Sequence, residues 1–277
     1  MGKVWFITGT SRGFGRVWAE AALERGDRVV ATARNVEALA DLSARYGAAH
    51  LLPLALDVTD KAQVDAVVPR AHEHFGGLDV VVNNAGYGLF GAIEEVTEDQ
   101  ARAQLETNFF GALWVTNAAL PLFRAQGGGH VVQVSSVGGV NAWRNLGLYH
   151  ASKWALEGLS QALSAEVAPF GIKVTLVEPK SYTTDWRGSS AVRARPIEAY
   201  GFLREGASGA LAMGRADPRA TAEAIFAVVD SDEPPLRLFL GDGPLAMIRA
   251  EYAKRLDEWE KWNDVAAAAE SSEEVAS

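Results

Sequence analysis

The stretch that decides the fold is Val4-Trp-Phe-Ile7-Thr8-Gly9-Thr-Ser-Arg12-Gly13-Phe14-Gly15, close to the start of the chain. Its first four residues are large and apolar, as in a strand that is buried on both faces. The glycines at positions 9, 13 and 15 allow a tight turn into a helix and a close approach of backbone to a pyrophosphate. Because the N-terminus of the following helix favours an anion, the stretch predicts a dinucleotide site.

Apolar, β-branched runs recur along the chain and alternate with segments of helical periodicity. The expected strands are Val4–Ile7, Val29–Thr32, His50–Leu56, Leu78–Val82, His130–Val134, Ile172–Val177 and Leu236–Leu240. The expected helices are Phe14–Arg25, Val36–Tyr46, Ala62–Phe75, Thr97–Leu122, Leu148–Ala168 and Arg219–Val229. This alternation predicts an α/β fold with a doubly wound, seven-stranded parallel sheet and helices on both faces.

Composition excludes several classes of protein. The chain has 277 residues, of which 48% are hydrophobic and 22% charged, and its net charge is −9 without any basic cluster, so a nucleic-acid binder is not expected. It contains no cysteine, which excludes disulfides and Cys-ligated metals, and no metal site is expected. No run reaches the ~18 apolar residues of a membrane span, and the N-terminus lacks a secretion signal, so we expect a cytoplasmic enzyme.

One domain is expected over residues 1–262, because no Pro/Ser-rich linker divides the chain. Within it, residues 181–214 have no clear period and follow the sixth strand, where a long insertion is usually a substrate lid; a disordered surface loop is the alternative. Leu245–Trp262 shows helical spacing and is expected to pack on the body or on a partner. Residues 263–277 are small and acidic and predict a disordered tail.

Tyr149 and Lys153 stand four residues apart, which places both on one face of a helix. A nearby cation lowers the pKa of a phenol, and a phenol tuned in this way can exchange a proton with an alcohol or a carbonyl. Taken alone, such a pair is more often packing beside a solvated charge.

The end of the second strand determines which dinucleotide is expected. A carboxylate there would bind the ribose hydroxyls, but the position is Ala33, followed by Arg34. With Arg12 in the glycine-rich turn, two guanidiniums favour the phosphorylated dinucleotide, NADPH, over NADH; two solvated charges are the alternative. Asp57 ends the third strand, where it could accept a hydrogen bond from adenine or cap the next helix.

These elements together resemble the short-chain dehydrogenase/reductase family. The matching residues are the Thr-Gly-x3-Gly-x-Gly turn at 8–15, Asp57, Asn-Asn-Ala-Gly at 83–86, Asn108, Ser136, Tyr149, Lys153, Pro179 and Thr184, in the family's order over roughly residues 3–245. The resemblance implies a Rossmann fold and a nicotinamide cofactor. It also implies that the cofactor is bound by Gly9, Ser11, Arg12, Gly13, Phe14, Gly15, Arg34, Asp57, Val58, Asn84, Ala85, Gly86, Tyr149, Lys153, Pro179 and Thr184.

The same resemblance implies a role for each catalytic residue. Tyr149 is expected to give its proton to the substrate oxygen, and Ser136 rather than Ser135 to hold that oxygen, since the family's serine stands thirteen residues before the tyrosine. Lys153 is expected to bind the nicotinamide ribose and to lower the pKa of the tyrosine. Asn108 is expected to hold a water that links Lys153 to solvent.

One position departs from the family, which usually has Pro-Gly after the sixth strand where this chain has Pro179-Lys180. A lysine there would restrict the loop or present a cation at the mouth of the site. Thr184, five residues after the proline, still matches the threonine that contacts the carboxamide.

The substrate is expected to be an apolar ketone, because aromatic and aliphatic residues surround the predicted site. These residues are Tyr87, Phe90, Val137, Trp143, Tyr182 and Trp186, and core packing is the alternative for each of them. Oxidation of an alcohol, including a steroid or sugar alcohol, and a non-catalytic cofactor-binding regulator are the competing functions. The helices at 97–122 and 148–168 match those through which family members form homodimers or homotetramers.

Overall fold

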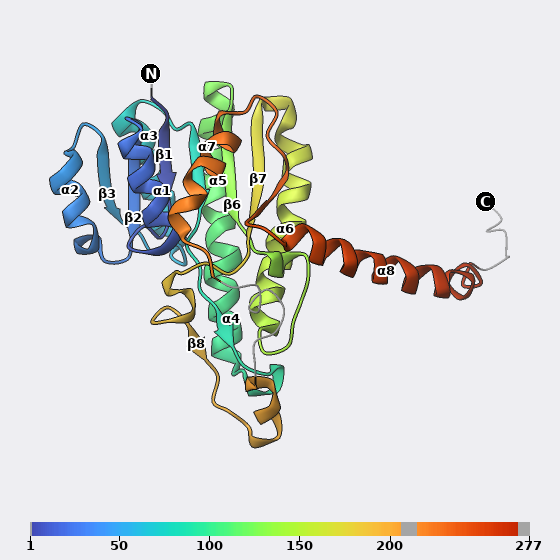
Figure 1. Cartoon of the computed structure of the whole chain (residues 1–277). Coiled ribbons are helices and arrows are strands. Elements are labelled where there is room, and N and C mark those ends of the chain that lie inside the picture. The colour runs from blue at the N-terminus through green and yellow to red at the C-terminus, as the bar shows by residue number, and fades with distance from the viewer. Residues whose placement is uncertain (1, 206–214, 271–277) are drawn as a thin grey trace.

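The protein is described here by a computed structural model that covers residues 2–205 and 215–270. Seven strands form one sheet in the order β3-β2-β1-β4-β6-β7-β9, and every neighbouring pair is parallel (Figure 1). The strands are β1 (Val4–Ile7), β2 (Arg28–Ala33), β3 (Leu51–Ala55), β4 (Val80–Asn83), β6 (Gly129–Val134), β7 (Ile172–Pro179) and β9 (Arg237–Leu240). All seven predicted strands are thus confirmed, as is the doubly wound parallel sheet.

Helices cover both faces of this sheet. The helices are α1 (Gly13–Glu24), α2 (Ala40–Tyr46), α3 (Lys61–Phe75), α4 (Glu98–Leu105), α5 (Gly111–Gln126), α6 (Gly147–Val167), α7 (Ala222–Asp230) and α8 (Pro244–Ala267). Helices α1, α2 and α7 contribute apolar side chains to one core, and α3, α5 and α6 contribute them to the other. Successive strand residues serve opposite faces, so Trp5 lies in the first core and Phe6 in the second, both fully buried.

The single helix predicted over Thr97–Leu122 is divided in the structure. Between α4 and α5 lies one wide turn of π-helix, Glu106–Phe110, which contains Asn108. Such turns insert one extra residue into a helix and occur often at functional sites. Apolar periodicity does not reveal a one-residue insertion, so the sequence predicted the helical segment but not its internal break.

The structure describes most of the predicted lid. Two short strands that the sequence did not predict, β5 (Leu89–Phe90) and β8 (Val192–Arg193), pair in parallel and fasten this segment to the loop after β4. Short 3₁₀-helices at Asp185–Arg187 and Glu198–Arg204 flank β8. The remainder of the predicted lid, residues 206–214, lies outside the described residues.

Helix α8 leaves the body and extends away from it (Figure 1). It continues to Ala267, so the first residues of the predicted tail are helical, while 271–277 lie outside the described residues. Among the helices that the structure describes, none has the length and apolar character needed to cross a bilayer.

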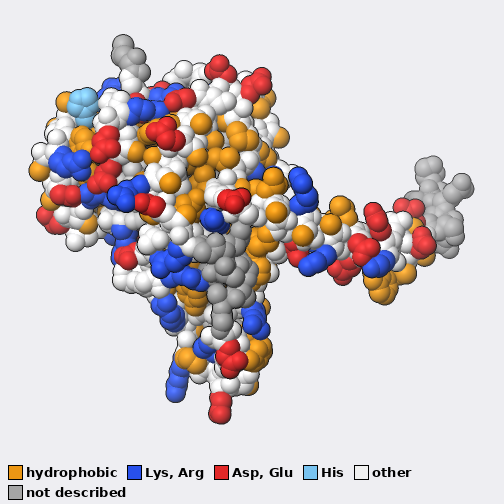
Figure 2. Space-filling view, viewed as in Figure 1, with side chains coloured by type: hydrophobic (Ala, Val, Ile, Leu, Met, Phe, Trp, Pro, Cys, Tyr) orange, Lys and Arg blue, Asp and Glu red, His pale blue; other side chains and the backbone are white. Residues whose placement is uncertain are grey.

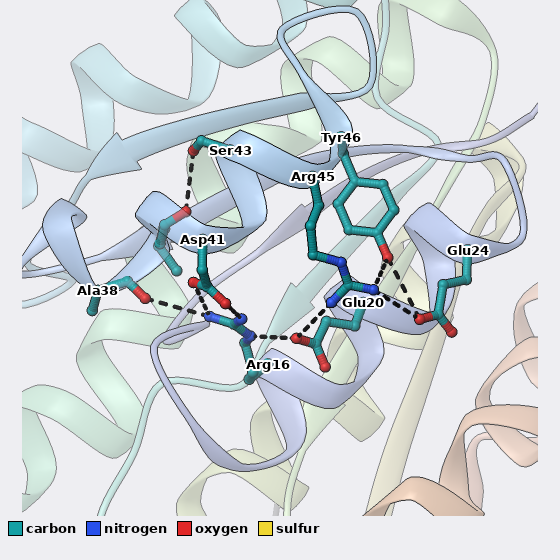
Figure 3. Close-up of polar contacts among 9 residues, drawn as sticks. Arg16, Glu20, Glu24, Ala38, Asp41, Ser43, Arg45 and Tyr46 are labelled. Atoms are coloured by element: carbon teal, nitrogen blue, oxygen red, sulfur yellow. Dashed lines mark hydrogen bonds and ion pairs between the residues drawn. The ribbon is translucent and has the colours of Figure 1, made fainter.

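A polar network fixes the segment that follows β2 (Figure 3). Arg16 of α1 forms hydrogen bonds and ion pairs with Asp41 of α2 and donates to the carbonyl of Ala38 at 3.3 Å. Arg45 of α2 reaches back to Glu24 of α1 at 3.3 Å. Because Arg34 immediately follows β2, this network holds the backbone that carries it.

Candidate active site

A cavity of about 960 Å³ opens at the carboxyl ends of the strands, where open parallel sheets bind their ligands. All the residues predicted to bind the cofactor line this cavity except Gly15. Ser136 and five of the six predicted substrate residues line it too. Of those six, Phe90 does not line the cavity but packs against Trp186, with ring centroids 5.2 Å apart. The fold therefore brings together groups that come from positions 9 to 192 of the chain.

The glycine-rich turn forms one wall of this cavity. Gly9 and Gly13 have φ values of 69° and 62°, which L side chains rarely adopt. A Cβ on Gly9 would lie 3.0 Å from the Cα of Ala85, and one on Gly15 would lie 2.6 Å from the carbonyl oxygen of Gly9. Backbone thus forms a cradle that a side chain would fill, at a helix N-terminus, and these residues fit a dinucleotide pyrophosphate.

Asn84 secures the turn from the neighbouring strand β4. Its side-chain amide donates to the carbonyls of Thr8 at 2.8 Å and Gly9 at 3.0 Å. The hydroxyl of Thr8 in turn accepts from the backbone N–H of Asn84 and Ala85. The Asn-Asn-Ala-Gly sequence therefore shapes the cradle through its second asparagine.

Tyr149 and Lys153 occupy one face of α6 and are both buried. The ammonium of Lys153 donates to the carbonyl of Val134 at 2.7 Å and lies 6.0 Å from the centre of the Tyr149 ring. Ser136 begins the turn after β6, and its Oγ accepts from the N–H of Gly138 at 3.0 Å. The end of β6 and the first turns of α6 thus bring the serine, the tyrosine and the lysine to the same cavity.

Protonation of this group differs from the expectation drawn from the sequence. Burial raises the pKa of Tyr149 to about 12, and the Ser136 hydroxyl lowers it by less. Burial also lowers the pKa of Lys153 to about 8, against the opposite influence of Glu157. Burial thus acts against the lowering of the tyrosine pKa that the resemblance implies for Lys153, and that role stays a prediction.

Asn108 lies behind the catalytic group, in the π-helical turn, and is buried. Its side-chain oxygen accepts from the N–H of Tyr87 at 3.0 Å, and its NH₂ donates to the carbonyl of Tyr87 and to the hydroxyl of Ser152, both at 3.1 Å. These contacts join the loop after β4 to α6, and that loop carries Gly86 and Tyr87 into the cavity.

The two arginines predicted to bind a phosphate have different surroundings. Arg12 donates from one guanidinium nitrogen to Asp185 at 2.9 Å and to Ser189 at 2.7 Å, both in the lid. Arg34 is exposed at the cavity wall, and the structure gives it no ion pair within residues 2–205 and 215–270. The second arginine is therefore the more available of the two for an anion.

The two readings of Asp57 are decided in part. The cap of α3 is Asp60, whose carboxylate accepts from the N–H of Gln63 at 3.1 Å. Asp57 instead accepts from the N–H and the hydroxyl of Thr59, at 3.0 and 2.8 Å. Asp57 lines the cavity, so its prediction as an adenine contact stays open while its capping role is excluded.

Aromatic rings define the lid side of the cavity. Trp186 packs edge-on against Tyr149, with ring centroids 5.0 Å apart. Tyr182 is buried and packs edge-on against Phe14 at 5.1 Å, so core packing explains it at least in part. Lys180, the departure from the family pattern, donates to the carbonyl of Asp242 at 3.0 Å, which ties the loop after β7 to the loop after β9.

Two features of the site escaped the sequence analysis. His150, next to Tyr149, lines the cavity, is buried and bonds the carbonyl of Gly138 through Nδ1 at 2.9 Å. Burial lowers its pKa, which keeps the ring neutral at physiological pH. The sequence offered one signal for His150, its place directly after Tyr149. That signal is weak, because neighbouring residues of a helix point in different directions and need not line the same cavity.

A buried acidic cluster, formed by Glu157, Glu178 and Arg237, is the second feature. Arg237 of β9 lies 2.9 Å from a carboxylate oxygen of Glu157 and 3.6 Å from one of Glu178. Glu157 stands one helical turn after Lys153 and raises its pKa. Because two carboxylates share one guanidinium away from water, burial and then Glu157 raise the pKa of Glu178 to about 8.

This cluster predicts that stability falls as the pH rises from about 4.5 to about 8. In that window the unfolded chain releases the proton of Glu178 while the folded protein keeps it, so the free energy of unfolding decreases. Glu178→Gln removes this dependence. Its free energy of unfolding, relative to that of the parent protein, is therefore expected to increase as the pH rises from 5 to about 9. Chemical denaturation between pH 5 and about pH 9 measures the effect, with exposed Glu233→Gln as control. Parallel pH profiles for the parent and Glu178→Gln would contradict it.

Comparison with known proteins gives a consistent result. The family profile described as short chain dehydrogenase matches residues 3–193. An oxidoreductase of Botryotinia fuckeliana, BOA17, is 42% identical over 277 residues, which cover 97% of this chain and 99% of the relative. The crystal structure of a short-chain dehydrogenase from Streptomyces avermitilis superposes with a TM-score of 0.90 at 39% identity, over 98% of this chain and 99% of that one.

Solved neighbours also identify the kind of cofactor. A 3-ketoacyl-(acyl-carrier-protein) reductase from Brucella melitensis, complexed with NADH, is similar with a TM-score of 0.76 and 27% identity, over 88% of this chain and 98% of that one. Other neighbours hold NAD or forms of NADP. The similar structures thus hold nicotinamide dinucleotides of both kinds.

Proposed function

The chain belongs to the short-chain dehydrogenase family, and from that premise we propose that it reduces a ketone or aldehyde carbonyl to an alcohol with NADPH. The observation that carries this proposal is the convergence of Tyr149, Ser136 and Lys153 on one cavity that the glycine-rich turn also lines. NADPH supplies the hydride when it is bound.

The protonation of Tyr149 supports the reducing direction. A phenol with a pKa of about 12 is protonated at neutral pH, as a proton donor must be. Alcohol oxidation would require the phenolate at the same position. Protonation of the developing alkoxide by Tyr149 prevents an isolated negative charge in this buried site.

Ser136 and Lys153 support that proton donor. The Oγ of Ser136 accepts from Gly138 and its hydroxyl is within hydrogen-bond reach of Tyr149, so it can donate to a substrate carbonyl oxygen that the tyrosine also contacts. Lys153 uses one N–H on Val134 and has two more for the cofactor ribose and the tyrosine. Its pKa of about 8 suits it to return a proton to Tyr149 near neutral pH.

The substrate proposed is an apolar carbonyl compound. Trp186 packs on the ring of Tyr149, and Val137 and Trp143 line the same part of the site, so the wall beside the proton donor is aromatic and aliphatic. Consumption of NADPH with a panel of small ketones, followed by product analysis, tests the activity. Tight NADPH binding without turnover on any carbonyl or alcohol would favour a regulatory protein instead.

We expect the parent protein to use NADPH more efficiently than NADH. Arg34 lines the cavity after Ala33, without a carboxylate at the end of β2 to repel a phosphate. Arg34→Ala is expected to lower kcat/KM for NADPH by about 10- to 100-fold, since hydrogen bonds to charged groups contribute ~1.5–3 kcal/mol. Arg12→Ala is expected to have a smaller effect, because that guanidinium is shared with Asp185.

Steady-state kinetics with both cofactors measure this preference. The kcat/KM for NADH is expected to change by less than about threefold in both variants. NADH carries a neutral 2′-hydroxyl in place of the phosphate, so a guanidinium there has no anion to bind. Arg102→Ala, on the exposed face of α4, is the matched control. A parent protein that prefers NADH, or an Arg34→Ala variant that loses both cofactors equally, would overturn the assignment.

A further inference from the structure

His150 is a polar side chain of the cavity to which the proposed mechanism gives no task. It stands on α6 directly after Tyr149, lines the cavity and is only 3% exposed. On the face that Figure 2 shows, histidine is visible near β3 and not around the lid, in keeping with this burial. Any group that binds the imidazole of His150 therefore comes from the cavity.

The hydrogen bond of this imidazole determines which ring nitrogen carries a hydrogen. Nδ1 lies 2.9 Å from the carbonyl oxygen of Gly138. A carbonyl oxygen can only accept, so Nδ1 is the donor in this bond. Because burial lowers the pKa of His150 and the ring is neutral, Nε2 carries no hydrogen. Nε2 is therefore a hydrogen-bond acceptor.

This acceptor has no partner in the described part of the chain. Within residues 2–205 and 215–270, no donor bonds Nε2 of His150, and the atom is closed to solvent. A buried acceptor that is left without a hydrogen bond costs free energy, and most such atoms in proteins are paired. A ligand in the cavity that carries a donor would supply the missing bond.

The aromatic neighbours of His150 also line the cavity. Trp143 packs edge-on against the imidazole, with ring centroids 5.3 Å apart, and the Tyr149 ring lies 5.7 Å away. Trp143 is half-buried and belongs to residues 140–146, which contain no helix and no strand. A half-buried side chain on such a segment moves aside at lower cost than a core residue. A ligand can therefore open a path to Nε2 by displacing Trp143.

The imidazole lies close to the groups that are proposed to hold the substrate oxygen. A Cβ placed on Gly138 would lie 2.6 Å from Nδ1 of His150 and 3.3 Å from Oγ of Ser136, so both side chains pack against this one small residue. If Ser136 and Tyr149 hold the carbonyl oxygen, the atoms next to that carbonyl are the ones nearest to His150. A donor that reaches Nε2 is then attached close to the carbonyl carbon.

We propose that Nε2 of His150 accepts a hydrogen bond from a hydroxyl group of the substrate, carried on the carbon next to the carbonyl or on the one after it. The inference rests on the proposed carbonyl reduction and names its substrate class, a hydroxy ketone with an otherwise apolar skeleton. Ser136 and Tyr149 hold the carbonyl oxygen while His150 holds the hydroxyl. Two polar contacts in an apolar pocket fix the orientation of the ketone toward the cofactor.

Pairs of ketones that differ only in the hydrogen-bond donor test this contact. The α-hydroxy and α-methoxy derivatives of acetophenone have similar carbonyl reactivity, but only the first can donate to Nε2. The β-hydroxy and β-methoxy derivatives of propiophenone make the same comparison one carbon further along. With NADPH, we expect kcat/KM of the parent protein to be at least about tenfold higher for the hydroxy member of one pair, because the methoxy member leaves the buried acceptor unpaired.

Two substitutions of His150 separate its two nitrogens. In His150→Asn the side-chain NH₂ can replace Nδ1 toward Gly138, but nothing replaces Nε2. In His150→Gln the amide reaches the position of Nε2 and the bond to Gly138 is given up. We expect the hydroxy-to-methoxy ratio of kcat/KM to fall to about one in His150→Asn, chiefly through KM, and to stay above about threefold in His150→Gln. His50→Asn, exposed just before β3, is the matched control and keeps the ratio of the parent protein.

The possible results distinguish this inference from the proposed function. Equal kcat/KM for the hydroxy and methoxy members of both pairs would overturn the inference and leave carbonyl reduction intact. A preference that persists in His150→Asn would place the contact on another residue. Equal losses on both members of a pair, in both variants, would make His150 a packing residue only; circular dichroism of each variant reports whether the fold is retained. No reduction of any ketone, with NADPH bound, would overturn the inference together with the proposed function.

Discussion

Tyr149→Phe is expected to lower kcat for carbonyl reduction by about 10³-fold or more, since a positioned proton donor contributes ~10²–10⁴-fold. The change removes one hydroxyl group from a buried ring that packs against Trp186. The ring contacts remain, so the fold is expected to persist. Binding of NADPH is expected to weaken by less than about threefold, because the glycine-rich turn that cradles the pyrophosphate is unchanged.

Single-turnover kinetics and calorimetric titration of NADPH separate the two effects. Tyr46→Phe is the matched control, since its hydroxyl bonds Arg45 and Glu24 in the surface network of Figure 3, outside the cavity. Retention of a tenth or more of the parent kcat would reject Tyr149 as the proton donor. A parallel loss of NADPH binding would show that the hydroxyl serves the cofactor instead.

Gly9→Ala is expected to raise the Kd for the dinucleotide by about 100-fold, equivalent to ~2.7 kcal/mol. A left-handed φ costs an L residue ~1–2 kcal/mol, and φ at Gly9 is 69°. The new Cβ would also lie 3.0 Å from the Cα of Ala85, so the two loops that form the cradle must separate. The cavity wall would then lose its close approach to the pyrophosphate.

Gly47→Ala distinguishes backbone strain from damage to the site. Gly47 has nearly the same φ, 66°, but a Cβ there meets nothing within 4 Å. Gly9→Ala is expected to lose more stability than Gly47→Ala in thermal denaturation, because its Cβ also meets Ala85, and only Gly9→Ala is expected to lose dinucleotide affinity in titration. Equal affinities in the two variants would show that the turn at Gly9 does not contact the cofactor.

Sequence alone predicted the strands well because most of them are continuous apolar runs, and the central ones are buried on both faces. The order of Gly9, Ser136, Tyr149 and Lys153 along the chain also matched the family, and the fold brings all four to one cavity. These features depend on local composition and on spacing within one helix or turn, which a linear pattern records directly.

Features that depend on contacts between distant segments could not be predicted. Arg12 binds Asp185, which lies 173 residues away in the lid. The pKa of Tyr149 depends on its burial, which no neighbour in the sequence reports. Glu157 and Glu178 come together only because β7 and α6 pack on each other and β9 supplies Arg237.

The position of β1 in the sheet has a consequence for how the protein is made. β1 is synthesised before the other strands of the sheet, yet it lies between β2 and β4, so its second edge stays unpaired until residue 83 has been synthesised. After that point β6, β7 and β9 add to the same edge one after another, in the order of translation. The dinucleotide turn therefore belongs to the part of the chain that can assemble early, whereas the proton donor on α6 joins it later. We expect nascent chains stalled after β4 to resist proteolysis before any catalytic activity can be detected.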